Sequence, residues 1–165
     1  PKWHNLVNKA ATISLLTALG KLNNIQLVIA GHVRGADTQL TASETAELAA
    51  LPSVVFAPQG AASVSLIKQC DVLIDVDASI ALDAIQLGKL YVRPKYLQDA
   101  SVQTIYDTLG GAVQASSEQE MVALLSTAVL PTNVVSPMYT EVVIGDVASN
   151  IPKQYYLKLK ALTQQ

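Results

Sequence analysis

Polar residues and glycines follow several apolar runs of this sequence, at positions where a ligand could bind. The runs are IQLVIAG (25–31), SVVFAPQG (53–60), DVLIDV (71–76) and LYVRP (90–94). A glycine after a strand lets a phosphate approach the backbone closely, although glycine is also an ordinary turn residue. The candidate ligand-binding residues at these positions are Gly31, His32, Arg34, Gln59, Gly60, Asp75, Asp77 and Ser79, and Arg93 and Lys95 stand at the end of the fourth run.

Three aspartates, Asp75, Asp77 and Asp83, form the most informative group. The first two lie at the end of a predicted strand, and Asp83 lies in the first turn of the helix that follows. A carboxylate there can accept hydrogen bonds from ribose hydroxyls. The helix dipole also favours Asp83 at this position, and Asp77 could simply cap the helix. The spacing therefore leaves a structural role and a ligand-binding role open.

Several kinds of site are excluded by spacing. The stretch GHVRG departs from the dinucleotide fingerprint G-x-G-x-x-G, and the P-loop pattern is absent. The sequence has no zinc-ligand spacing and no nucleophile elbow, so we expect no metal and assign no catalytic residue. Cys70 precedes a strand and is expected to pack in the core.

These candidates need a framework of alternating strands and helices. The apolar runs, together with AVQA (112–115), have the continuous hydrophobicity of buried strands. The alternation predicts an α/β fold, a three-layer Rossmann-like domain with a mostly parallel sheet, whose ligands bind at the carboxyl ends of the strands. The predicted helices span residues 10–22, 40–51, 63–70, 79–89, 101–110 and 116–129, with a closing helix over 150–165, and their predicted N-caps include Ser43, Ser79 and Ser117.

Composition limits the class of protein. The chain has 165 residues, of which 50% are hydrophobic and 15% charged, which is typical of one domain over 1–165. The net charge of -2 and the lack of a basic patch argue against nucleic-acid binding. No apolar run reaches the roughly 18 residues of a membrane span. The single cysteine is typical of a reducing, cytoplasmic compartment. Because the chain begins at Pro1, we expect a fragment of a longer protein.

The order of the segments resembles that of a known family. LVIAG, SVVFAPQG, LIKQCDVLI, LDAIQLGK and LGGAVQASSEQEMVALL follow one another over roughly residues 9–130. They are similar to segments of the C-terminal domain of retaining glycosyltransferases with the two-domain GT-B fold. The resemblance implies a nucleotide diphosphate sugar as the sugar donor, its transfer to an acceptor, and no cofactor.

The same resemblance implies roles for single residues. Asp83 stands in the place of the family's ribose-contacting glutamate, and Asp75 has the separation of the glutamate near the sugar. Lys9 stands in the place of the phosphate-binding lysine, whereas its partner arginine has no clear match. The acceptor site and any general base would come from a missing N-terminal domain, so the isolated domain is expected to be inactive.

A narrower resemblance points to a second function. CDVLIDVDASIALDAI is similar to a stretch of the non-catalytic partner subunit of the bacterial accessory-secretion glycosyltransferases, which modify Ser-rich adhesins. That subunit keeps the fold and binds the acceptor protein. Three hypotheses follow: a sugar-donor-binding enzyme domain, a non-catalytic partner that stabilises a glycosyltransferase or binds its acceptor protein, and an unrelated doubly wound domain.

Overall fold

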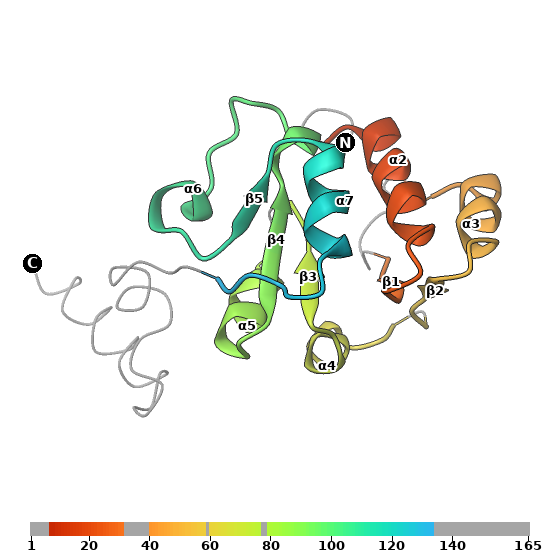
Figure 1. Cartoon of the computed structure of the whole chain (residues 1–165), viewed down its shortest axis with the longest axis horizontal. Coiled ribbons are helices and arrows are strands. Elements are labelled where there is room, and N and C mark those ends of the chain that lie inside the picture. The colour runs from red at the N-terminus through yellow and green to blue at the C-terminus, as the bar shows by residue number, and fades with distance from the viewer. Residues whose placement is uncertain (1–6, 32–39, 59, 77–78, 134–165) are drawn as a thin grey trace, which may run out of the picture.

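The protein is represented by a computed structural model, which describes residues 7–31, 40–58, 60–76 and 79–133. Within these residues helices alternate with short strands (Figure 1). The strands are β1 (Leu27–Ile29), β2 (Val54–Phe56), β3 (Val72–Ile74), β4 (Leu90–Pro94) and β5 (Val113–Ala115). The helices are α2 (Lys9–Gly20), α3 (Ala42–Ala49), α4 (Ser63–Gln69), α5 (Ile80–Gln86), the 3-10 turn η2 (Lys95–Leu97), α6 (Ile105–Leu109) and α7 (Glu118–Ser126).

The strands form two open parallel sheets. β1 pairs with β2, with Val28 opposite Val55. β4 lies between β3 and β5, with Val92 opposite both Ile74 and Val113. All five residues of β4 are buried, so this strand is the centre of its sheet.

Helices cover both faces of the three-stranded sheet. On one face, the larger core cluster contains Leu15 and Leu19 of α2, Met121 and Leu125 of α7, and Val92 of β4. The smaller cluster, on the opposite face, joins Ala81 and Ile85 of α5 to Tyr91 of β4 and Tyr106 of α6. The two clusters use alternate residues of β4, as side chains along a strand must. The predicted α/β, three-layer Rossmann-like domain with parallel strands is therefore confirmed.

The hydrogen bonds at the N-termini of α3 and α7 correct one predicted N-cap and confirm another. Thr41, rather than the predicted Ser43, is the N-cap of α3: its hydroxyl accepts from the amide of Glu44 at 3.2 Å, and the Glu44 carboxylate accepts from the amide of Thr41. Ser43 lies inside the helix and hydrogen-bonds Glu47 instead. Ser117 caps α7 as predicted, whereas the Glu120 carboxylate binds the amide of Ser116.

The segment predicted as a helix over 101–110 is helical only from Ile105 to Leu109. The Asp99 carboxylate accepts from the amide and the hydroxyl of Ser101, which favours a local turn over a helical start. Thr104 and Asp107 then form the capping box that begins α6. The predicted closing helix over 150–165 lies outside the described residues.

Candidate functional site

The connection from β3 to α5 is the centre of the candidate site, because it carries the predicted aspartates at the carboxyl edge of the sheet. Two side chains of β4 bind its backbone. The Tyr91 hydroxyl donates to the carbonyl oxygen of Asp75 at 3.2 Å, and the Nε–H of Arg93 donates to that of Val76 at 2.9 Å. Both side chains are fully buried. The backbone that leaves β3 is therefore fixed from the neighbouring strand.

Arg93 also binds two further side chains at the same edge. Its NH1 group lies 2.8 Å from Oδ2 of Asp107, and its NH2 group donates to Gln98. Asp107 lies 2.9 Å from the amine of Lys95 as well, and accepts from the backbone amide of Thr104. Two cations, the buried Arg93 and the partly exposed Lys95, therefore share one carboxylate, and the three side chains together carry one net positive charge.

The Asp107 carboxylate remains ionised because its hydrogen bonds outweigh its burial. Burial alone would raise the pKa of Asp107. The amide of Thr104 and the cations of Lys95 and Arg93 act in the other direction, and they hold the pKa well below its usual range. The buried Arg93 therefore has a charged partner at neutral pH, as a guanidinium in a protein interior requires.

Three of the predicted site residues lie between the end of β3 and the first turn of α5. Asp75 directly follows β3, and its amide donates to the carbonyl of Val92 at 3.4 Å. Ser79 takes the predicted N-cap position of α5, but its side chain makes no capping hydrogen bond. Asp83 lies in the first turn of α5 and is half-buried, beside the fully buried Ala84. The structure thus places Asp75 and Ser79 in the β3–α5 connection, and Asp83 in the first turn of α5.

Lys9 lies at the same edge of the sheet. The amide of Asn8 donates to the carbonyl of Leu97 at 2.8 Å, so α2 begins beside the carboxyl end of β4. The Lys9 amine lies 2.9 Å from the Glu44 carboxylate, and 36% of its side chain is exposed. Its charge is already paired with the capping glutamate of α3, which the sequence did not reveal.

The two described glycines of the site differ in their surroundings. Gly60 has a φ of +80°, a conformation that side chains with a Cβ rarely adopt, so the turn after β2 accounts for a glycine there. Gly31 is exposed, and no heavy atom lies within 4 Å of the place a Cβ would take. The remaining predicted site residues lie outside the described residues: His32, Arg34, Gln59 and Asp77.

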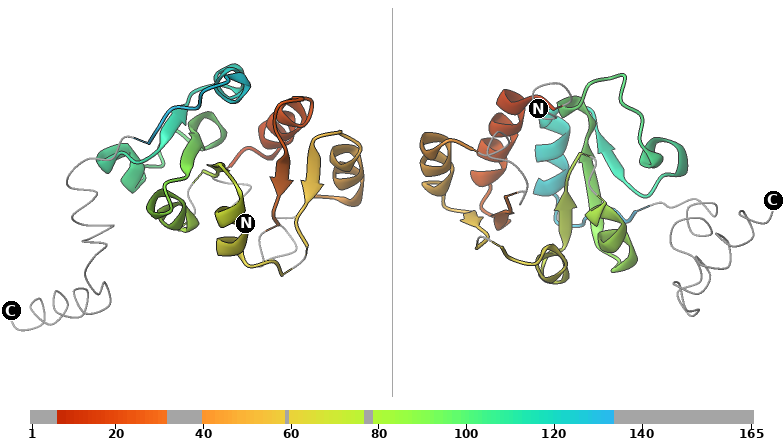
Figure 2. Two further views of the ribbon diagram at one scale, coloured as in Figure 1. Left: turned by 60° about the horizontal axis from the view of Figure 1, so that its bottom comes forward. Right: turned by 180° about the vertical axis from the view of Figure 1, so that it is seen from behind.

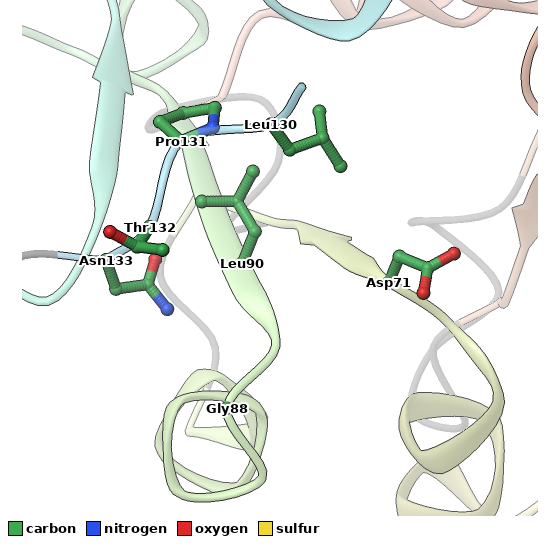
Figure 3. A pocket seen from close by; sticks show the side chains of 7 residues that line it. All are labelled: Asp71, Gly88, Leu90, Leu130, Pro131, Thr132 and Asn133. Atoms are coloured by element: carbon green, nitrogen blue, oxygen red, sulfur yellow. The ribbon is translucent and has the colours of Figure 1, made fainter. Parts of the chain in front are cut away.

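A hollow at the opposite edge of the sheet is a weaker candidate (Figure 3). It has a volume of about 210 Å³, and its lining includes Asp71 and Leu90, at the amino ends of β3 and β4. Ligand pockets usually enclose roughly 300–1,000 Å³ and hold several converging polar groups. Asn133, which also lines the hollow, is already bound to the amide of Tyr91 and the carbonyl of Lys89. The hollow therefore offers little to a ligand.

The Arg93–Asp107 pair is the part of the site that sequence reasoning missed. In the sequence, Arg93 is only a charged residue at the end of a predicted strand. That position is as typical of an arginine that contacts a ligand as of one in a buried ion pair. The pattern T-x-x-D over 104–107 was a signal for its partner, since it places a carboxylate at the start of a helix.

Two absences hold for the part of the chain that the structure describes. It contains no group of three or more His, Cys, Asp or Glu side chains that could hold a metal ion. No helix in it is long and apolar enough to span a bilayer.

Comparisons of the chain with protein-family models, with curated proteins and with solved structures gave no match.

Proposed function

We propose that this chain is the nucleotide-sugar-binding domain of a two-domain glycosyltransferase, and that the β3–α5 connection contacts the sugar donor. The proposal rests on the order of sequence segments that resembles the GT-B family, on the Rossmann-like fold, and on the edge of the sheet at which Asp75, Ser79 and Asp83 lie. In open α/β sheets, ligands bind outside the carboxyl ends of the strands.

The observation that carries the proposal is the way β4 binds this connection. A buried arginine is costly, and a buried pair such as Arg93 with Asp107 is weak evidence for a role in stability alone. Here the guanidinium also binds the carbonyl of Val76, in the connection that follows β3. A binding site needs its contacting groups supported by a second layer of hydrogen bonds. Arg93 and Tyr91 supply that layer for Asp75.

The proposed mechanism is electrostatic. Backbone N–H groups and a cation, Lys9 or Arg34, would stabilise the departing diphosphate. Asp83 would accept hydrogen bonds from the ribose hydroxyls. The acceptor and any general base would come from the other domain.

One observation favours a second function, the non-catalytic partner subunit. The amine of Lys9 is already paired with Glu44 at 2.9 Å. A diphosphate would have to compete with that carboxylate for the lysine. In a subunit that binds an acceptor protein and no sugar donor, the pair could simply hold α2 against α3.

Titration with nucleotides separates the two functions. Uridine and guanosine diphosphate should be titrated calorimetrically into the wild type, Asp83→Ala and Asp71→Ala. Loss of a charged hydrogen-bond acceptor costs about 1.5–3 kcal/mol, so Asp83→Ala should weaken binding by roughly 10- to 150-fold. Asp71 is the matched control, because it is an exposed aspartate at the opposite end of β3. Its variant should bind as the wild type does.

Each outcome has a distinct meaning. If the wild type binds neither nucleotide while its circular dichroism is that of a folded protein, the non-catalytic function is favoured. If wild type and Asp83→Ala bind equally, the role of Asp83 is wrong. If Asp71→Ala weakens binding as much as Asp83→Ala, the nucleotide lies elsewhere than at the carboxyl edge.

A further inference from the structure

Lys95 carries the positive charge that the ion pairs at the carboxyl edge of the sheet leave in excess. The carboxylate of Asp107 lies 2.8 Å from NH1 of Arg93 and 2.9 Å from the amine of Lys95. Among the described residues, both cations make their ion pair with this one carboxylate. One negative charge balances one of the two positive charges, so the other remains.

The two cations differ in how much they need Asp107. Arg93 is fully buried, and a buried charge must be paired because water cannot solvate it. The side chain of Lys95 is 41% exposed, so water reaches it. Asp107 is therefore the counter-ion of Arg93, and the charge of Lys95 is the one that is available to a ligand.

The hydrogen bonds of Asp107 do not depend on Lys95. A carboxylate has about four lone-pair sites, and an ammonium has three N–H donors. Besides Lys95, four donors bind Asp107: the guanidinium of Arg93, the amide and the hydroxyl of Thr104, and the side-chain amide of Gln114. These four match the capacity of the carboxylate. The Lys95 amine can therefore bind another acceptor without leaving Asp107 unsatisfied.

Lys95 lies where a parallel sheet binds its ligands. It directly follows β4, the central strand of the three-stranded sheet, and ligands of such sheets bind outside the carboxyl ends of the strands. α5 and α6 lie on one face of this sheet and α7 on the other (Figure 2). Arg93 links Asp107 of α6 to the carbonyl of Val76. Lys95 is therefore joined, through Asp107 and Arg93, to the β3–α5 connection.

Lys9, the other lysine of the candidate site, is paired differently. Its amine lies 2.9 Å from the carboxylate of Glu44, which pairs with no second cation among the described residues. That pair is neutral, so an anion would have to displace Glu44 before it gained the charge of Lys9. At Lys95 the positive charge already exceeds the negative charge, and no such displacement is needed.

We propose that Lys95 binds a phosphoryl group at the carboxyl end of β4, while Asp107 holds the lysine at this edge. Phosphoryl oxygens accept strong, charge-assisted hydrogen bonds from an ammonium group. The anion site follows from the charges and hydrogen bonds of the cluster. Identifying its ligand as the diphosphate of the sugar donor rests on the function proposed above, and it makes Lys95 the cation that faces the departing diphosphate.

Calorimetric titrations of the full chain test the proposal, with pyrophosphate, uridine diphosphate and guanosine diphosphate as separate probes. Lys95→Gln removes the charge, and its fold should be intact by circular dichroism because Asp107 keeps four other donors. It should bind each probe that the wild type binds at least about 10-fold more weakly. Lys95→Arg keeps the charge and should recover most of the affinity. Lys89→Gln is the matched control, because Lys89 is also half-buried and directly precedes β4, at the opposite edge of the sheet.

The outcomes separate this proposal from the proposed function. If the wild type binds no probe, or if Lys95→Gln binds every probe as the wild type does, the anion site is wrong. If only Lys9→Gln weakens nucleotide binding, the diphosphate lies at Lys9, so the anion site is wrong while the proposed function stands. If Lys95→Gln weakens pyrophosphate binding but the nucleotides bind no more tightly than pyrophosphate, the anion site stands and the nucleotide-binding function is wrong. Equal losses in Lys95→Gln and Lys89→Gln would reflect the net charge of the chain and would overturn the anion site.

Discussion

Replacing Arg93 by Met tests whether the buried cation holds the carboxyl edge of the sheet together. The side chain of Arg93 is fully buried, and it binds Val76, Asp107 and Gln98. Removing one partner of a buried ion pair costs about 3–5 kcal/mol, because the other charge stays buried without compensation. Asp107 would keep Lys95 and the amide of Thr104, so a loss of about 3 kcal/mol is expected.

Two further variants separate charge from geometry. Arg93→Lys keeps the positive charge but loses the planar group that reaches three acceptors, so we expect it to cost about 1–3 kcal/mol. In Arg93→Met with Asp107→Leu, both charges are gone, and replacing a whole buried pair is often close to neutral. The double variant should therefore be more stable than the summed losses of Arg93→Met alone and Asp107→Leu alone predict.

Urea unfolding followed by circular dichroism measures these free energies. Arg93→Met, Asp107→Leu and their combination form a double-mutant cycle, and residues in direct contact usually give interaction energies of about 0.5–3 kcal/mol. A loss below about 1 kcal/mol for Arg93→Met, or additive effects in the cycle, would show that the guanidinium contributes little. The role of Arg93 in fixing the β3–α5 connection would then be wrong.

Four other predictions can be tested separately. The pKa of Asp107 is lower in the folded than in the unfolded chain, so the free energy of unfolding should fall as the pH drops below about 4. This free energy, measured by urea titration at each pH, should fall less steeply in Asp107→Asn, and equal pH dependence of the two proteins would contradict the prediction. Burial, and then the charge of Glu118, raise the pKa of Tyr96 to about 12, and its hydroxyl has no hydrogen-bond partner among the described residues. Tyr96→Phe should therefore leave the stability to thermal unfolding unchanged or slightly raise it, and a loss of stability above about 1 kcal/mol would reveal a partner. A Cβ on Gly20 would lie 2.7 Å from two side-chain atoms, so Gly20→Ala should cost about 1–2 kcal/mol while Gly31→Ala has room; equal stability of both variants would refute the clash. The isolated chain should transfer no sugar, since the GT-B resemblance implies a cleft between two domains; product formed by the 165-residue chain would contradict the assignment.

The sequence was sufficient to predict most strands and helices, because continuous apolar runs indicate buried strands and helical spacing of apolar residues indicates helices. LYVRP over 90–94 became β4 with the predicted bounds, and the helix predicted over 10–22 became α2 with small changes at its ends. The misplaced features depend on single hydrogen bonds. Thr41 rather than Ser43 caps α3 because Thr41 lies three residues before Glu44, and both halves of a capping box require that spacing.

The candidate site was only partly predictable, because its members come from distant parts of the sequence. The grouping of Asp75, Ser79 and Asp83 followed from their position after one strand. The pairing of Arg93 with Asp107 joins residues from β4 and α6, and that of Lys9 with Glu44 joins two helices. Each cation could equally face a ligand when only its place in the sequence is known. The structure therefore changed the interpretation of the charges more than that of the fold.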